Sequence, residues 1–524
     1  MAQPSLGAKA AVGGDGTGSR SRPGAGGSIA GFLRQRPVQL LLLVTVAGAA
    51  LRFATLDVQS IWLDEAATID LVHKGFSGML SDLPKSESAP PLYYLLVWCW
   101  TRVFGSGPIA FRSLSALAGT LTIPALYWAG AVRSRRIGLW AATLCAFSPA
   151  MFYYSQEARA YGLMIMFSAW ALAFWLHAMD SPRGRLVWGW AATSALALLS
   201  HYFAVFPFIP EAALLFWRHG PKRTVRPAAL VGAVGAALIP LAYAQASTGG
   251  KLKWIEESSL GSRVLETGKL FLVGVYGPVE LFTATALAVV ALAALWRLRR
   301  ADRPTWQFAA RLATVGAIAL LLPLAIAAIH LIDVFDGRNM LESWPIFALL
   351  VAAGIAAVRP RAYQLLSGAA IVSVFLGVIA ATEVLPAYQR DDWRGAAKSL
   401  PPAEGQRLLV AEDFSAIPLS VYLPSISTVL PGKASAGDRT VRTREVVFIA
   451  LRQRKTFGSP EPPAPPHGRL PGFAGPQIAS SEAWATARYV APGPRTVALS
   501  ALRVLAGQAD AEVMVANEKS ARRP

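Results

Sequence analysis

Two adjacent carboxylates, Asp64 and Glu65, lie just beyond the first apolar segment of this chain, in the stretch Trp62-Leu63-Asp64-Glu65. Carboxylates are costly near a bilayer, and those found there usually mark chemistry or an ion path. A carboxylate within reach of a reacting hydroxyl can act as its general base. The alternative is that the pair only caps a helix at the membrane surface, where the helix dipole favours negative charge.

A second polar island, Tyr154–Tyr161, lies between two apolar runs further along the chain. It contains Glu157 and Arg159, a second carboxylate and a guanidinium. If both islands face the same compartment, they form one polar site at a membrane surface. The alternative for Arg159 is a structural ion pair with Glu157, or a side chain that extends from a helix end to the interface.

Composition identifies the elements that must position these residues. The mean hydropathy is +0.41, and only 15% of the residues are charged, which excludes a soluble globular protein of 524 residues. Apolar runs of roughly 17–25 residues recur, the length that crosses ~30 Å of hydrocarbon as a helix. We therefore expect an all-α membrane protein with about eleven transmembrane helices. They cover residues 38–55, 110–131, 137–153, 160–178, 186–200, 203–217, 228–246, 279–296, 309–331, 342–358 and 363–381.

The net charge of +19 raises the question of a nucleic-acid partner, but the distribution of the charge argues against one. Basic residues cluster between alternate apolar runs, which is the positive-inside pattern of membrane proteins. The clusters are Arg133/Arg135/Arg136, Arg183/Arg185, Arg218/Lys222/Arg223/Arg226, Arg297/Arg299/Arg300/Arg303 and Arg359/Arg361, with Arg20, Arg22, Arg34 and Arg36 in the N-terminal tail. We expect a cytoplasmic N-terminus and no nucleic-acid partner.

The same alternation predicts which loops face outward. Arg133–Arg136 are cytoplasmic only if residues 57–109 form one long external loop, so Pro91–Phe104 is predicted to be a juxtamembrane helix at the interface. If residues 91–105 crossed the membrane instead, the following loops would be inverted. With the first assignment the external segments are Asp64-Glu65, Ser155–Arg159, His201-Tyr202, Lys251–Trp254, Asp333–Arg338 and everything after Thr382.

We therefore divide the chain into three parts. Residues 1–35, rich in Gly, Ser, Ala and basic residues, are predicted to be a disordered cytoplasmic tail. A cleaved signal peptide with Gln39–Ala50 as its apolar core is the alternative. Residues 36–382 form the transmembrane part, and residues 383–524 a small extracytoplasmic α/β domain. Two cysteines are too few to indicate a disulfide framework or a metal cluster.

The C-terminal domain shows a change of pattern after Thr382. Asp391–Ala397 is typical of the start of an amphipathic helix. Leu408–Ala411 and Val446–Leu451 are predicted to be strands because their residues are apolar in runs or in alternation. This domain carries no catalytic motif that we can identify.

Several motifs in this order resemble the bacterial members of glycosyltransferase family 39, relatives of the protein O-mannosyltransferases and of the aminoarabinose transferases that act on lipid A. They are Trp62-Leu63-Asp64-Glu65, Pro90-Pro91-Leu92-Tyr93-Tyr94, Phe111–Leu117, Tyr154–Tyr161, Arg338–Pro345 and Asp392-Trp393-Arg394. The likeness covers roughly residues 38–400. It implies a GT-C fold and the use of a polyprenyl-phosphate sugar. The run Asp336–Leu341 departs from the family's usual Arg-Tyr-Leu-Leu-Pro-like sequence.

The resemblance implies a role for Asp64. Asp64 matches the family's catalytic carboxylate, the general base that takes the proton of the acceptor hydroxyl. Glu65 is expected to orient Asp64, bind sugar hydroxyls or hold the acceptor. A monophosphate donor does not require a metal, although a divalent metal on Asp64, Glu65 and Glu157 stays possible.

The leaving group implied by the resemblance is a lipid phosphate, on which negative charge grows during transfer, so preorganised cations are needed. Arg159 and Arg338 are the candidates, because a guanidinium can contact phosphate in a bidentate manner. Arg52, at the outer end of the first apolar run, is a further candidate, with a snorkelling side chain as its alternative.

The remaining candidates would bind the donor sugar or phosphate. They are Glu157, Tyr161, His201 and Tyr202. The alternative for the aromatic residues is membership of the interfacial belt of a membrane protein.

The sequence thus predicts an integral protein of the bacterial inner membrane that transfers a hexosyl or pentosyl group at the outer face. Its partners would be a polyprenyl-phosphate-linked sugar, an acceptor hydroxyl of a glycan, lipid or protein, and membrane lipids. A polytopic transporter or lipid flippase is the alternative, since buried charges among many helices fit that class too. Transporters tend to show repeated halves, and this sequence shows no repeat.

Overall fold

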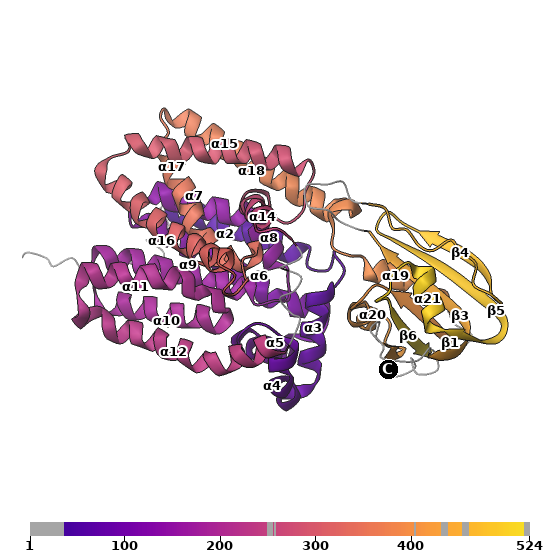
Figure 1. Cartoon of the computed structure of the whole chain (residues 1–524). Helices are drawn as coiled ribbons and strands as arrows, with labels where there is room; N and C mark the ends of the chain where they lie inside the picture. The colour runs from indigo at the N-terminus through magenta and orange to yellow at the C-terminus, as the bar shows by residue number, and fades with distance from the viewer. Residues whose placement is uncertain are drawn as a thin grey trace, which may run out of the picture.

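The computed structural model describes residues 36–248, 255, 258–402, 405–430, 439–452 and 461–517. The predicted cytoplasmic tail, residues 1–35, and the predicted external segment 251–254 lie outside this part of the chain. The described chain forms a large helical part and a smaller C-terminal domain built on one β-sheet, which lie side by side (Figure 1). The helical membrane protein with a small C-terminal α/β domain predicted from the sequence is confirmed.

The helical part follows the predicted apolar runs. Its long elements are α2 (Arg36–Ala54), α6 (Pro108–Ala131), α7 (Arg135–Phe147), α8 (Pro149–Ser155), α9 (Tyr161–Asp180), α10 (Gly184–Ser200), α11 (Val205–His219), α12 (Pro221–Ser247), α14 (Leu260–Val273), α15 (Glu280–Arg297), α16 (Arg303–Ala328), α17 (Trp344–Ala356) and α18 (Arg361–Val384). Short 3₁₀ turns join them: η1 (Tyr202–Ala204), η2 (Leu298–Arg300), η3 (Gly337–Ser343) and η4 (Pro386–Tyr388).

Eight helices of the described chain are long and apolar enough to cross a membrane, and α7 and α8 together give a ninth span bent by 58°. Each of the eleven predicted segments coincides with a helix or with this bent pair. One of the eight is η3 and α17 taken together, Gly337–Ala356, with 20 residues. The predicted segments 186–200 and 203–217 correspond to α10 and α11, which have 17 and 15 residues and are not among these spans. They are shorter than the roughly 20 residues that cross the hydrocarbon core without strain on the bilayer.

The break between α7 and α8 has a local cause in the sequence Ser148-Pro149. Proline lacks the N–H that would continue α7, but it is suited to the first turn of a new helix. The Ser148 hydroxyl accepts a hydrogen bond from the Met151 N–H at 3.4 Å and so caps α8. The turn leaves the carbonyls of Cys145 and Ala146 available to another donor.

Small residues allow the inner helices to pack closely. A Cβ atom added to Gly130 of α6 would lie 2.6 Å from the backbone nitrogen of Gly138 in α7, so only glycine permits this approach. α9 is central, because 78% of its most apolar 18-residue stretch is buried inside the protein. In α2 and in α12 only 17% of the corresponding stretch is buried. The helices that carry most of the lipid-facing surface therefore surround α6, α9 and α17.

Three shorter helices connect α2 to α6: α3 (Leu63–His73), α4 (Gly75–Ser86) and α5 (Leu92–Phe104). None of them is among the candidate spans. α3, α4 and α5 share an apolar cluster that includes Ile61, Val72 and Tyr93, and this cluster extends to α6 and α9. The first polar island is therefore anchored on a small packed layer at one end of the helical part.

The C-terminal domain holds a six-stranded sheet in the order β2-β6-β1-β3-β5-β4. The strands are β1 (Gln406–Ala411), β2 (Ile426–Leu430), β3 (Thr440–Leu451), β4 (Ala474–Ser480), β5 (Trp484–Ala498) and β6 (Glu512–Asn517). β1 and β3 are parallel, with Leu408 opposite Val446, and the other pairs are antiparallel. The strands predicted at 408–411 and 446–451 are confirmed within β1 and β3.

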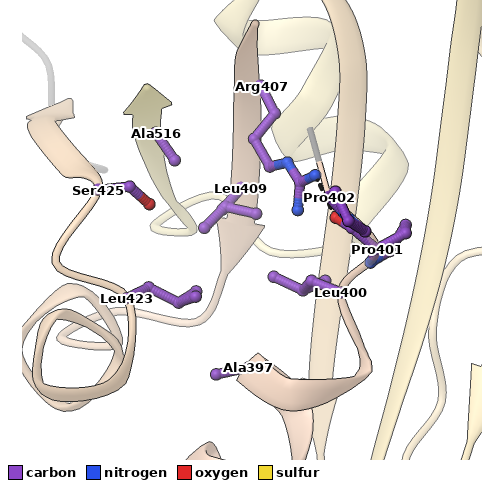
Figure 2. A pocket seen from close by; sticks show the side chains of 9 residues that line it. All are labelled: Ala397, Leu400, Pro401, Pro402, Arg407, Leu409, Leu423, Ser425 and Ala516. Atoms are coloured by element: carbon purple, nitrogen blue, oxygen red, sulfur yellow. Dashed lines mark hydrogen bonds between the residues drawn. The ribbon is translucent and has the colours of Figure 1, made fainter. Parts of the chain in front are cut away.

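Alternation along β1 explains why both faces of the sheet are covered. Leu408 and Val410 point into a cluster with α21 (Leu499–Ala506), and Leu409 and Ala411 into a cluster on the other face. That second cluster includes residues of α19 (Trp393–Ser399) and α20 (Ala416–Tyr422). The helix predicted to start within 391–397 is confirmed as α19. A cavity of about 240 Å³ lies beside α19, and Ala397, Leu409 and Arg407 are among the residues that line it (Figure 2).

Candidate active site

Asp64 lies in the first turn of α3, where the helix dipole favours a carboxylate. Its Oδ2 forms an ion pair with Nη1 of Arg338 at 2.9 Å, although the two residues are 274 positions apart. Both side chains are about one quarter exposed, Asp64 26% and Arg338 22%. The ion pair therefore joins α3 to η3, and its partly exposed side chains are accessible to a ligand.

Glu65, the neighbour of Asp64, is fully buried and points away from solvent. Arg112 of α6 donates to it in a bidentate manner, Nε to Oε1 at 2.7 Å and Nη2 to Oε2 at 2.6 Å. Arg390 donates to Oε2 at 3.2 Å, and the Ala158 N–H donates to Oε1 at 3.0 Å. Burial alone would raise the pKa of Glu65, but the two guanidiniums outweigh it and hold the pKa below its usual value.

These contacts narrow the roles predicted for Glu65. Both of its oxygens are engaged by groups of three separate segments, so the side chain ties α3, α6 and the second polar island together. Of the three expected roles, orientation of Asp64 is the one that this environment favours.

Arg159 lies beside Asp64 but has a partner that the sequence analysis did not name. Its Nη1 contacts both oxygens of the buried Glu87 at 2.8 and 3.0 Å. The same nitrogen lies 3.3 Å from the carbonyl oxygen of Asp64 and 3.3 Å from Oγ1 of Thr68. Burial alone would lower the pKa of Arg159, but the carboxylates around it raise the pKa well above the usual value. The predicted alternative, an ion pair with Glu157, is not what the structure shows.

Glu157 is almost completely buried, with 1% of its surface exposed. Its Oε2 has no hydrogen-bond partner among the described residues. Burial raises the pKa of Glu157 to about 7, and Arg390 opposes this effect. Asp64, Glu65 and Arg159 are the other charged groups close enough to act on it. The site thus contains, besides Asp64, the carboxyl group of Glu157, which gains a proton near neutral pH.

An aromatic wall borders these charges. The ring of Tyr161 lies 5.2 Å from that of Tyr154 and 5.4 Å from that of His201, between ring centroids. His201 is 6% exposed, and its Nδ1 has no partner among the described residues. Burial lowers the pKa of His201 to about 3, helped by Arg159 and Arg338. The imidazole is therefore neutral and can donate or accept one hydrogen bond.

Tyr202 has a different setting from the other predicted residues. Its hydroxyl donates to Oε1 of Gln245 at 2.8 Å, and Gln245 donates to the carbonyl of Ala89 at 3.0 Å. Ala89 lies two residues after Glu87, the partner of Arg159. In the described chain Tyr202 supports the loop that holds Arg159, while Asp64, Glu157, Arg159, Tyr161, His201 and Arg338 form the site itself.

Arg52 corrects one expectation. It is fully buried, and its guanidinium donates to the carbonyls of Gly48, Ala146 and Cys145 and to the hydroxyl of Ser155. It therefore neither reaches a phosphate nor snorkels to the interface. The bend between α7 and α8 leaves backbone carbonyls without helical partners in an apolar environment, and Arg52 satisfies them.

Arg112, which lies in the motif Phe111–Leu117, was assigned no role in the sequence analysis, and Arg390 and Glu87 were not named there. A signal exists for Arg112, because a charge inside the apolar run 110–131 requires a partner. The sequence carries no comparable signal for Arg390 or Glu87, which lie in connecting segments.

A divalent metal on Asp64, Glu65 and Glu157 is compatible with the sequence alone. Among the described residues, no group of three or more His, Cys, Asp and Glu side chains converges as metal ligands would. Glu65 is occupied by two guanidiniums, and Asp64 by one. The three carboxylates named for a metal therefore do not form a ligand set in this arrangement.

The sequence profile of the family described as dolichyl-phosphate-mannose-protein mannosyltransferase matches residues 88–243, less than half of the chain. The fold is similar to that of ArnT from Cupriavidus metallidurans, solved bound to undecaprenyl phosphate and in the apo state. The TM-scores are 0.50 and 0.51, with 13% and 12% identity, 73% and 74% of this chain covered, and 84% and 85% of the other.

A comparison with curated protein sequences found no match. The matched region 88–243 contains Arg112, Glu157, Arg159 and His201. The chain thus has the GT-C glycosyltransferase fold, and its predicted resemblance to the protein mannosyltransferases and aminoarabinose transferases is confirmed.

Proposed function

We propose that this integral membrane protein transfers a sugar from a polyprenyl-phosphate donor to the hydroxyl group of an acceptor. The observation that carries the proposal is the half-open ion pair between Asp64 and Arg338, 2.9 Å long, in a protein with the GT-C fold. Arg159, Glu157 and the Tyr161–His201 wall surround this pair. Cations, a base and aromatic rings in one half-open site are what transfer of a phosphate-linked sugar requires.

The proposed reaction starts when the donor phosphate binds. The phosphate competes with Asp64 for Arg338, because both are anions that seek the same guanidinium. Asp64 is then released to accept the proton of the acceptor hydroxyl. The acceptor oxygen bonds to the anomeric carbon as the bond from that carbon to the phosphate oxygen breaks. Sugar is thereby moved to the acceptor, and the lipid phosphate leaves with one additional negative charge.

Each remaining residue has a proposed part in this step. Arg338 and Arg159 stabilise the charge that grows on the leaving phosphate. Tyr161 and neutral His201 form one wall of the sugar subsite. The protonated form of Glu157 donates a hydrogen bond to a sugar oxygen, which a carboxylate could not do. Two guanidiniums supply the charge stabilisation, so the proposed reaction needs no divalent metal.

The proposed donor lipid agrees with the ArnT structure, which contains undecaprenyl phosphate. We place the site and the C-terminal domain at the outer face of the bacterial inner membrane, because the basic loops mark the opposite end. The acceptor would be a hydroxyl of a glycan, a lipid or a protein. Hexosyl and pentosyl donors differ only in hydroxyl contacts, so either type fits this site.

The test is transfer from a radiolabelled polyprenyl-phosphate sugar by the purified protein. Asp64→Asn is expected to reduce the transfer rate by a factor on the order of 10²–10⁴, because an amide cannot take the acceptor's proton. Donor binding should persist, since the lost interaction belongs mainly to the transition state. A wild-type rate in a well-folded Asp64→Asn protein would remove Asp64 as the base. No transfer by wild-type protein from any hexosyl or pentosyl donor would contradict the function.

A further inference from the structure

Leu56–Ile61, which are separated from α3 only by Trp62, have no regular secondary structure and lead into the helix that carries Asp64. Their backbone groups have no helix or sheet to satisfy them, so other segments must supply partners. From the membrane side, Arg112 donates to the carbonyls of Leu56, Gln59 and Ser60 at 2.8, 2.8 and 2.9 Å. We call Leu56–Ile61 the pre-α3 loop.

The C-terminal domain holds the same loop from the opposite side. The Ile61 N–H donates to the hydroxyl of Tyr422, the last residue of α20, at 2.7 Å. The Ser60 hydroxyl lies 3.2 Å from the same oxygen. Arg394 of α19 donates through its backbone N–H to Ser60 Oγ at 3.0 Å and through its guanidinium to Asp57 at 2.9 Å.

The segment between α18 and α19 adds a third contact. The Arg390 N–H donates to the side chain of Gln59 at 3.1 Å, and its guanidinium reaches Glu65, the residue next to Asp64, at 3.2 Å. The guanidinium also donates to the carbonyls of Gln156 and Tyr153. Arg390 is 5% exposed, so these contacts are sheltered from solvent.

Apolar packing accompanies the polar contacts. Ile417, Val421 and Tyr422 of α20 pack against the cluster that contains Ile61 and the inner face of α3. Figure 1 shows α19 and α20 on the side of the C-terminal domain that faces α3. The described part of the domain is therefore docked on the element that carries the proposed base.

We propose that the C-terminal domain contributes to catalysis by holding Asp64 in position. Tyr422 and Arg390 are the positioning residues. This inference rests on the proposed function. The Tyr422 hydroxyl accepts a hydrogen bond from the N–H of Ile61, three residues before Asp64. Arg390 donates to the carboxylate of Glu65, the residue that follows Asp64. Neither group touches the reacting atoms. Their contribution is geometric, and a displacement of about 1 Å at a catalytic group is enough to cost about 10²-fold in rate.

The test is removal of one hydroxyl by Tyr422→Phe in the full-length protein. This variant keeps the ring that packs on α3 but leaves the buried Ile61 N–H without an acceptor. We expect kcat to fall on the order of 10-fold, while the KM for the polyprenyl-phosphate sugar stays within about twofold. Tyr489→Phe is the matched control, because its hydroxyl bonds to the Gly468 carbonyl inside the domain, away from the pre-α3 loop. It should transfer at the wild-type rate.

A double-mutant cycle separates positioning from general stability. If Tyr422 acts through Asp64, Tyr422→Phe should reduce the residual rate of Asp64→Asn by less than about twofold. A full additional 10-fold loss in that background, or a wild-type kcat in Tyr422→Phe alone, would overturn the inference.

Hydrogen exchange supplies a readout that does not depend on activity. The peptide covering residues 56–66 should exchange faster in Tyr422→Phe than in wild type. In Tyr489→Phe the exchange rate of this peptide should be the same as in wild type. Unchanged exchange in Tyr422→Phe refutes the inference even if the wild-type protein transfers sugar. Faster exchange with no transfer by wild-type protein would instead locate the failure in the proposed function.

Discussion

One nitrogen atom of Arg159, Nη1, both stabilises the fold by pairing with Glu87 and lies at the proposed active site next to Asp64. Nη1 neutralises Glu87, which is only 2% exposed at its side chain, and it lies next to Asp64. A donor phosphate would approach a cation that already has a carboxylate partner. Substitution of Arg159 alone therefore changes stability and transfer together, and a second substitution is needed to separate them.

We predict that Arg159→Ala nearly abolishes transfer and destabilises the protein, by about 3–5 kcal/mol, because Glu87 is left as an uncompensated buried charge. Arg159→Lys keeps the charge but loses the planar fork, so it should weaken transfer less. In Arg159→Ala/Glu87→Gln the thermal stability should recover while transfer stays absent. Wild-type transfer by this double variant would show that Arg159 has only a structural role.

Glu157 should make the stability of the protein depend on pH. Its pKa is about 7 in the folded protein and ~4.3 in an unfolded chain. The folded state therefore binds more protons between these values, so the stabilisation by Glu157 is complete below the lower pKa and is lost as pH rises through the upper one. The melting temperature in detergent should fall from pH 5 to pH 8, and less steeply in Glu157→Gln. Parallel curves for both proteins would contradict this.

At the scale of elements, the sequence predicted the features that depend only on residues close together in the chain. The apolar runs predicted the helices, because the length of a run can be read from the local sequence. The motifs that resemble family 39 named Asp64, Glu157, Arg159 and Arg338, which the structure brings together. The partners were not predictable, because they depend on how distant segments pack. Arg112 and Arg390 reach Glu65 across 47 and 325 residues, respectively.

The packing of α6 on α7 gives a prediction at this scale. A methyl group at Gly130 would meet the backbone of Gly138, which cannot rotate away as a side chain can. Gly130→Ala should destabilise the protein by about 1–3 kcal/mol, the usual cost of overpacking. Gly232→Ala in α12 is the control, because a Cβ there meets nothing within 4 Å. It should be neutral or slightly stabilising, since alanine favours helix. Equal melting temperatures for the two variants would argue against this close approach.

At the scale of the whole molecule, the proposed orientation sets the basic loops in the cytoplasm and the site outside. Gly184 is the first residue of α10 and lies between the basic residues Arg183 and Arg185, and Ser88 lies beside Glu87; both are exposed. In a Cys99→Ser background, which removes the exposed native thiol, Ser88→Cys should react with an impermeant thiol reagent in spheroplasts. Gly184→Cys should react only after lysis. The reverse pattern would place the site in the cytoplasm.

The contacts between the C-terminal domain and the pre-α3 loop also affect when a newly made chain can become active. Ribosomes add ~5–20 residues each second, so Arg390 follows Glu65 out of the ribosome after roughly 16–65 seconds. During that interval the donor-binding helices can insert while the base still has no support from α19 and α20. A nascent chain in the membrane would therefore transfer sugar poorly until its C-terminal domain has been exported and has docked. Translocation of the C-terminus would then act as the switch that turns on each newly made enzyme.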